Sequence, residues 1–498
     1  MALPETGAPW PPPQWAPIYQ RIRVDDAWYA GDKARLSRVH QAEEHQAARR
    51  RLWGRREQPA PGRHDNRLHV PLPGDIATTS ADLLFADMPT IRVTDEATQA
   101  RTEQLLDEGR VQQILLGAAE QAAALSGVFL RVTWDKALAE RPLLTVVQPD
   151  AAIPEFRFGM LRAATFWEEL AGSDGHTVWR HFERHEPGRV VHALYRGTPD
   201  NVGRPMPLTE HPDTADLVAS LDPAGDGQSI STGIAGLTCT YVPNIGPNRA
   251  HRGSPLGRSD FAAPLYDLFD NLDTVWTSWM RDIRLARARL IVPSGYLRND
   301  GPGKGATFED REVYEQLNIP PTDGAAITLS QFDIRVEEHQ RSAEAIMRQA
   351  AQSAGYSPQS FGLHGEGEAI TATESDSRDQ RSMVTRKKKA GYWRHGLADA
   401  LHIMLQLDRA QFGTAITPER PSVEFGDGVA ESEQQTATTL DLLARAGAVS
   451  TGTKVRILHP EWDDADVQAE INSILAETGA AAPDPVASFP LARRESQF

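Results

Sequence analysis

Two short glycine-containing patterns in this sequence have the residue types that bind phosphate. GAVSTGTK, at 447–454, has the spacing of a phosphate-binding loop, in which backbone amides and a lysine hold phosphate oxygens. It ends in Gly-Thr-Lys rather than Gly-Lys-Thr, so the lysine is displaced, and no strand precedes it. The end of one helix followed by the start of another explains this segment better. The GPGKG at 301–305 is interpreted as a turn for the same reason.

Histidine, acidic and cysteine residues give no stronger sign of catalysis. His181 and His185 are four residues apart in a strand-like segment that offers no third metal ligand, so we interpret them as surface or core histidines. Asp463 and Asp464 stand at a predicted helix start, where the helix dipole favours acids. The single cysteine, Cys239, excludes a disulfide framework and is expected to be a buried small hydrophobe. We therefore predict no catalytic residue, no metal and no cofactor.

The composition is that of a large acidic protein with enough hydrophobic residues to form hydrophobic cores. A length of 498 residues suggests about three domains, and 40% of the residues are hydrophobic. The net charge of −16 argues against a protein that clamps nucleic acid over its whole surface, but it allows a channel through which DNA slides. No apolar run approaches the roughly 18 residues of a membrane span, and the N-terminus lacks the pattern of a signal peptide. The chain is expected in the cytoplasm when it is made.

One long amphipathic stretch organises the rest of the chain. Between 259 and 293 the apolar residues recur at steps of three and four, which predicts a helix of roughly 50 Å. Acids dominate its early part and arginines its late part, in the order that complements the helix dipole. Trp276 and Trp279 are among the apolar residues of this helix that need to be covered. A helix this long needs neighbouring helices to cover it, in this chain or in other copies.

The flanking segments predict an α+β protein. A small insert at 294–335 separates the long helix from a second helix at 336–354, which ends before Gly355. A glycine-rich stretch at 356–373 is expected to be a flexible loop, and a third long helix follows at 374–412. Alternating patterns predict an antiparallel block of five strands, at 128–135, 143–150, 164–171, 177–186 and 190–197.

In this order the parts resemble the portal proteins of tailed bacteriophages, in the form found in siphophages, including those of actinobacteria. The resemblance covers about residues 18 to 478, and its strength lies in the order and separation of its motifs. The motifs are GVFLRVTWD (127–135), VPN (242–244), SPLGRSDF (254–261), AGYSPQSFG (354–362), ITATE (370–374) and AGAVSTGTKVRILHPEW (446–462).

The resemblance implies a ring, usually of twelve copies, at a unique capsid vertex of the virion, assembled in the host cytoplasm without a membrane. Double-stranded DNA would pass through its tunnel during packaging and ejection. The implied partners are the terminase large subunit, a head-completion adaptor protein, and the major capsid and scaffold proteins. The implied regions are an N-terminal arm (1–17), wing (18–258), outgoing stem helix (259–293), clip (294–335), returning stem helix (336–355), tunnel loop (356–373), long wing/crown helix (374–412), crown (413–478) and C-terminal tail (479–498).

The resemblance places the predicted tunnel loop beside the DNA. The loop contains His364, Glu366 and Glu368, and no lysine or arginine occurs from Tyr356 to Asp376. Because basic contacts bind phosphate strongly, a neutral or acidic lining keeps DNA mobile.

The basic residues of the long helices have two interpretations each. Arg281, Arg284 and Arg287 of the stem either pair with acids, including Asp270 or Asp273 of an adjacent copy, or contact phosphate. The runs at 49–51 and 387–389 are equally ambiguous. A different class of function is a phage nucleic-acid-processing enzyme, either a nuclease or a packaging ATPase subunit. The missing phosphate loop and the lack of converging acids count against it.

Overall fold

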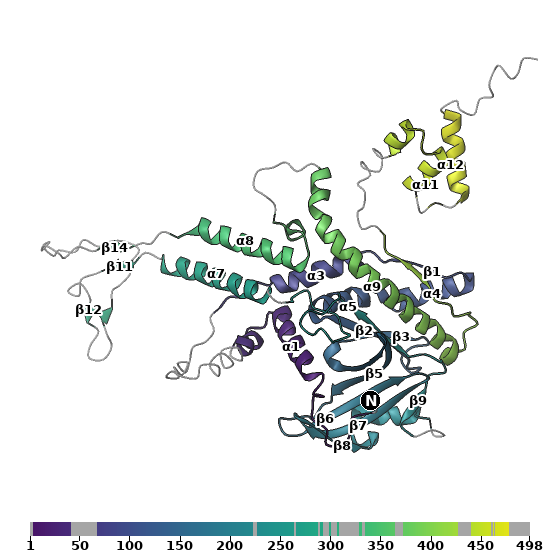
Figure 1. Ribbon diagram of the computed structural model, residues 1–498, viewed down its shortest axis with the longest axis horizontal. Helices are drawn as coiled ribbons and strands as arrows, with labels where there is room; N and C mark the ends of the chain where they lie inside the picture. The colour runs from purple at the N-terminus through teal and green to yellow at the C-terminus, as the bar shows by residue number, and fades with distance from the viewer. Residues whose placement is uncertain are drawn as a thin grey trace, which may run out of the picture. The chain divides into compact units, whose positions relative to one another are not determined.

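The computed structural model divides into two compact units, 1–426 and 427–498. It combines long helices with antiparallel sheets, which confirms the α+β class (Figure 1). Among the described residues, no helix is long and apolar enough to cross a membrane. The described residues are 3–40, 67–222, 227–262, 265–286, 289–291, 298–299, 306–307, 328–330, 334–363, 372–426, 440–459, 462 and 464–477.

The two largest sheets that the structure describes are antiparallel and lie in the first unit. The larger has the order β4-β5-β6-β7-β8, with β9 also paired to β7, and the smaller has the order β10-β2-β3. The larger sheet consists of β4 (Ala152–Arg157), β5 (Met160–Glu169), β6 (Val178–Glu186), β7 (Arg189–Thr198), β8 (Asn201–Met206) and β9 (Ser229–Ser231). The smaller consists of β2 (Gly127–Thr133), β3 (Leu143–Val147) and β10 (Cys239–Pro243).

The five predicted strands correspond to β2, β3, β5, β6 and β7, and the sequence pattern missed β4, β8, β9 and β10 of these two sheets. β4 and β8 each contain a proline, and β8 also contains a glycine, so both lack the composition typical of strands. The sheet path places them at its two edges, where proline is tolerated. Cys239, in β10, is buried, as predicted.

The proline-rich N-terminal segment packs against the larger sheet. Backbone hydrogen bonds join residues 7–10 to residues 200–203, at the β7–β8 hairpin. Trp10 is buried, with its ring centroid 4.8 Å from that of Trp167 and 5.4 Å from that of Phe182. The described part of the predicted arm therefore packs into the hydrophobic core beside the larger sheet.

Helices and the smaller sheet build the main core. α3 (Leu72–Phe85), α5 (Val111–Leu125) and α9 (Ala372–Phe412) pack around β2, and α9 runs 41 residues close to its predicted bounds (Figure 1). Trp393 of α9 is fully buried edge-on against Phe85 of α3, with ring centroids 4.9 Å apart. α1 (Ala16–Ala30), α4 (Glu96–Glu108), α6 (Pro212–Ala215) and the 3-10 turns at 149–151, 208–210, 216–220 and 358–361 also belong to the described part of this unit.

Two antiparallel helices form the predicted stem. α8 (Val336–Ala354) has the predicted bounds, and Gly355 ends it in the left-handed conformation, with φ 104°. α7 (Leu265–Leu285) lies beside it but is shorter than the predicted 259–293 (Figure 1). Before α7, the Asp260 amide donates to the Ala123 carbonyl at the end of α5, so this segment is held outside the helix.

A strand, rather than a continued helix, follows α7. β11 (Arg289–Ile291) pairs with β14 (Thr328–Ser330), and β12 (Arg298–Asn299) pairs with β13 (Ala306–Thr307). β12, β13 and β14 lie in the predicted clip, whereas β11 lies in the last part of the predicted stem helix.

The boundary of the C-terminal region lies later than predicted. β15 (Ser422–Glu424) pairs with β1 (Thr90–Arg92), so residues 413–426 belong to the first unit and not to the predicted crown. The second unit contains α11 (Thr451–Leu458) and α12 (Asp464–Glu477), which pack on each other.

Candidate functional site

The segment that resembles a phosphate-binding loop is a connection between helices. Gly447 has a φ of 64°, and its amide bonds back to the Ala444 carbonyl, as at a helix end. The Ser450 side chain caps α11 by accepting from the Thr453 amide at 3.2 Å. The interpretation as an end-and-start signal is confirmed.

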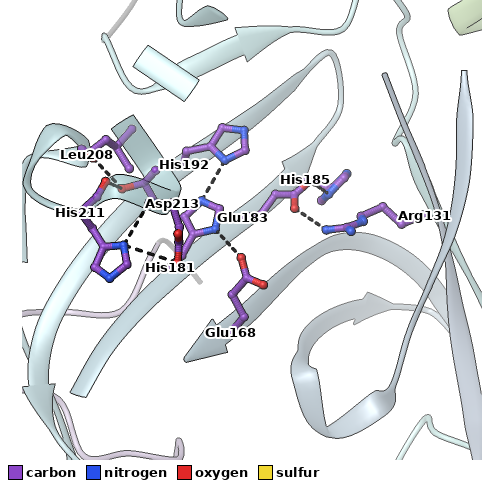
Figure 2. Close-up of polar contacts among 10 residues, drawn as sticks. Arg131, Glu168, His181, Glu183, His185, His192, Leu208, His211 and Asp213 are labelled. Atoms are coloured by element: carbon purple, nitrogen blue, oxygen red, sulfur yellow. Dashed lines mark hydrogen bonds and ion pairs between the residues drawn. The ribbon is translucent and has the colours of Figure 1, made fainter. Parts of the chain in front are cut away.

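The histidines of β6 belong to a buried polar cluster between the sheets (Figure 2). A His181 ring nitrogen lies 3.1 Å from Glu168 Oε1, and the other lies 3.2 Å from His192 Nδ1. The His181 and His192 rings are stacked with centroids 5.3 Å apart. Burial lowers the pKa of His192 to about 4, so its imidazole is neutral at pH 7.

Glu183 is the charge that this cluster compensates. Its carboxylate accepts from Arg131 Nη1 at 2.5 Å and lies 2.9 Å from His185 Nε2 (Figure 2). Burial opposes ionisation of Glu183, but the hydrogen bond to His185 and the charges of His185 and Arg131 outweigh it and hold the pKa well below its usual range. His185 is also bonded to Thr238 Oγ1, at 2.5 Å.

These contacts give every member of the cluster a structural role. In the described ranges no three His, Cys, Asp or Glu side chains are placed to hold a metal ion. The interpretation of His181 and His185 as core histidines is confirmed by their 7% and 1% exposure. The alternation of residues 181, 183 and 185 on one face of β6 is the sequence signal that could have revealed the cluster.

A second buried network joins both stem helices to the rest of the fold. Asp260 Oδ2 accepts from Lys389 Nζ at 2.5 Å and from Tyr356 Oη at 2.8 Å, and Oδ1 accepts from Asn244 Nδ2 at 2.8 Å. Lys389 also donates to Ser80 Oγ of α3 at 2.7 Å. We call these five residues the stem junction, because Asp260 precedes α7, Tyr356 follows α8 and Lys389 lies in α9.

The stem junction assigns a role to one residue of the basic run at 387–389. Lys389 is buried, whereas Lys387 and Lys388 are exposed. Burial lowers the pKa of Lys389, and the charge of Asp260 opposes that shift. Lys389 is therefore a structural cation, while the two lysines before it remain open to solvent or a ligand.

Aromatic and ionic contacts hold α7 against α8. Trp279 stacks on His339 of α8 with centroids 6.1 Å apart, and Trp276 lies 5.2 Å from Trp279. Asp282 of α7 pairs with Arg335 at 2.9 Å and with His339 at 3.0 Å. Both tryptophans are half-buried within this chain, so α8 covers part of the surface that the sequence assigned to neighbouring copies.

The acids of α7 are paired within the chain. Asp270 lies 2.5 Å from Arg67 Nη1, and Asp273 accepts from the Val70 amide at 2.8 Å and lies 3.0 Å from His69 Nδ1. Asp270 and Asp273 therefore have partners within the chain, where the segment before α3 crosses α7, and their pairing with stem arginines of an adjacent copy stays a prediction.

The stem arginines have no such partners. Arg281 and Arg284 are exposed and make no ion pair with any described residue, although Arg284 bonds to the Met280 carbonyl. Arg287 lies outside the described residues.

The first residues of the predicted tunnel loop pack on the long helix that follows it. Residues 356–363 pack on α9: the Ser357 amide donates to Ser382 Oγ at 2.8 Å, and Thr385 donates to the Gly355 carbonyl at 2.5 Å. The predicted loop residues His364, Glu366 and Glu368 lie outside the described residues, as do the arginines at 49–51 and the GPGKG turn.

Comparison with known protein families identifies the family of this chain. A family model described as phage portal protein, SPP1 Gp6-like, matches residues 13–158 and 245–484, which is most of the chain. This chain belongs to the phage portal protein family. The family is a structural one, and a portal is a component of the virion. The match includes the whole stem, α9 and every residue of the stem junction except Asn244, and it omits most of the larger sheet.

Solved structures of phage-like particles also resemble this portal protein. The neck of an empty gene transfer agent particle computed with C6 symmetry is 14% identical, with a TM-score of 0.44, over 81% of this chain and 95% of that one. The virion of a native gene transfer agent particle (13%, TM-score 0.37) and the neck of the native particle computed with C12 symmetry (14%, TM-score 0.38) each cover 78% of this chain and 89% of theirs. No curated protein sequence matches the chain.

Proposed function

We propose that this portal protein forms a closed ring, of about twelve copies, through which double-stranded DNA enters and leaves the capsid. The observation that carries the proposal is the family match, which spans α7, α8 and α9 together. In this assignment α7 and α8 are the stem, residues 294–335 the clip, and the stretch after Phe361 the tunnel loop. The second unit is the crown.

The distal end of the stem supports assembly. Ile283 and Leu285 of α7 and Ile334 and Val336 at the start of α8 are 37–43% exposed, although all are large and apolar. The ion pair between Asp282 and Arg335 brings these ends together, so the four side chains share one end of the helix pair. Apolar surface of this kind is buried when a neighbouring copy packs against it.

Native mass measurement of the purified chain tests the ring. We expect a closed species of about twelve copies, and we expect Ile283→Asp with Leu285→Asp to give monomers or broken rings. Leu442→Asp, at a more exposed leucine of the second unit, is the matched control. A wild-type chain that stays monomeric at micromolar concentration would refute the ring. Trp276→Asp with Trp279→Asp should also prevent assembly, but a folding defect would have to be excluded first, since both side chains pack on α8.

The same stem supplies the DNA contacts in our proposal. Arg281 and Arg284 are exposed and lack acidic partners among the described residues, which leaves them available for phosphate. The net charge of −16 keeps the rest of the surface unattractive to DNA, so contact is confined to a few points. Arg281→Ala with Arg284→Ala should form rings but reduce the salt dependence of DNA binding, because each lost phosphate contact removes released counterions. An unchanged salt dependence would place these arginines away from the DNA.

Partner docking is assigned to the clip. Residues 294–335 are an insert between antiparallel helices, and His339 of α8 pairs with Asp282 of α7 at 3.0 Å, so the fold does not need the insert to orient α7 and α8. In our proposal the clip binds the terminase large subunit during packaging and a head-completion adaptor afterwards, while the wing contacts capsid and scaffold proteins. ATP hydrolysis then belongs to the terminase.

A further inference from the structure

We propose that adjacent copies of this chain are joined through their wings, by insertion of the β4–β5 hairpin tip of one copy into a cavity on the next. This inference rests on the proposed ring and adds to it a second contact, separate from the stem. Both halves of the contact are present in a single chain.

The inserting half is the hairpin tip at residues 157–162. Phe158 is 93% exposed and Met160 is 75% exposed, and Arg157 and Arg162 flank them. Phe158 is at φ 53°, in the left-handed region that glycine or asparagine would occupy with less strain. A bulky aromatic residue that is strained and exposed to solvent does not stabilise the isolated chain. Burial of the Phe158 side chain in a partner explains its presence better.

The receiving half is a cavity of about 870 Å³ beside β7 and β9. Its volume lies in the range of roughly 300–1,000 Å³ that protein pockets use for ligands, so it has room for a phenylalanine ring. Val190, Leu217 and Ile230 supply apolar lining. Four aspartates and one lysine also line it: Asp135, Asp213, Asp216, Asp222 and Lys136.

The cavity's negative charge comes from these aspartates rather than from the buried cluster. Glu183 also lines the cavity, but Arg131 and His185 already compensate it (Figure 2). Asp135, Asp213 and Asp216 are exposed, and Lys136 is the only lysine or arginine among the described residues of the lining. An apolar tip with two arginines therefore meets an apolar cavity with an acidic rim, which is the pairing that complementary interfaces use.

The sheet order places the two halves on opposite sides of the wing. β4 forms one edge of the larger sheet, whereas the cavity is lined by β7 and by β9, which pairs with β7 toward the other edge. A tip on one edge and its receptor on the other make a head-to-tail contact, and such contacts generate rings when the rotation closes. This geometry favours a second copy of the chain over a different partner, because one interface then uses both features.

Disulfide trapping tests the contact directly. Cys239 is the only native cysteine and is buried, so introduced cysteines report without interference. Met160→Cys combined with Ser220→Cys, at the lining of the cavity, should give a ladder of cross-linked oligomers after mild oxidation of assembled rings. Met160→Cys combined with Ser353→Cys, an exposed serine of α8, is the control and should give no ladder. Intact rings that show no ladder with the first pair would overturn this inference and leave the proposed ring standing, whereas failure of the wild-type chain to form rings would refute both.

A charge exchange keeps the test independent of cysteine geometry. One variant carries Arg157→Asp and Arg162→Asp, and the other carries Asp213→Arg and Asp216→Arg. Each alone places like charges at every wing contact and should assemble at least tenfold more weakly. In an equimolar mixture the tip of each variant meets an oppositely charged cavity on the other, so alternating rings should form. Equal assembly of all samples, or no recovery in the mixture, would overturn the inference.

Discussion

Replacing Lys389 with methionine should separate the stem from α9, because it breaks a buried ion pair. Asp260 would remain buried, with only Asn244 and Tyr356 left as donors. Removing one partner of a buried pair typically costs about 3–5 kcal/mol. Since two of the three donors survive here, we expect a loss near the lower end, about 3 kcal/mol in the free energy of unfolding of the first unit.

The assay is chemical unfolding of the unassembled chain, combined with amide hydrogen exchange at residues 259–262 and 355–357. Exchange should accelerate there first, because these segments connect α7 and α8 to the stem junction. Lys388→Met is the matched control, since its side chain is exposed and its replacement should change stability by no more than about 0.5 kcal/mol.

A double variant separates charge from packing. Lys389→Met with Asp260→Asn removes both charges and should be more stable than Lys389→Met alone by roughly 1–2 kcal/mol, because no buried ion is left uncompensated. The stem junction does not act as a compensated ion pair if Lys389→Met is as stable as Lys388→Met. The same conclusion follows if the double variant loses more stability than Lys389→Met and Asp260→Asn lose together as single variants.

Three further predictions concern pH, the tunnel and the clip. Burial raises the pKa of Asp25 to about 7 from an unfolded value of 3.8, despite the hydrogen bond that it accepts from Tyr266. The contribution of this group to stability is therefore present below pH 4 and is lost as the pH rises through 7. The free energy of unfolding of the wild type relative to Asp25→Asn should fall across that window, and Asp26→Asn, at the neighbouring half-buried aspartate, should not reproduce the effect. Glu366→Lys with Glu368→Lys should form normal rings but stall DNA packaging, most at low salt, because lysines in the bore bind phosphate; unchanged packaging by intact rings would mean that the loop does not face DNA. Deletion of residues 294–335 with a short linker should leave α7 and α8 folded, as judged by circular dichroism, and abolish terminase binding; a deleted chain that packages at the wild-type rate would contradict the clip assignment.

The sequence alone determined the elements whose signals are local. α8 and its glycine end, the course of α9 and the five strongly alternating strands follow from periodicity and from residues that begin or end helices. The helix-to-helix interpretation of residues 447–454 was also correct, because Ser450 and Gly447 act within a few residues of themselves. The order of these parts was sufficient to indicate the portal family.

Only the tertiary structure decided the features that depend on distant partners. Asp260 was predicted to lie in the stem helix, but it is held at the stem junction by a lysine 129 residues away. Lys387, Lys388 and Lys389 are identical in type, and only the packing of α9 shows that the third is buried. Asp270 and Asp273 are paired by residues 67–70, which no spacing rule connects to α7. Periodicity reports how a residue faces its own helix or strand, whereas burial and ion pairing depend on what the fold brings to that face.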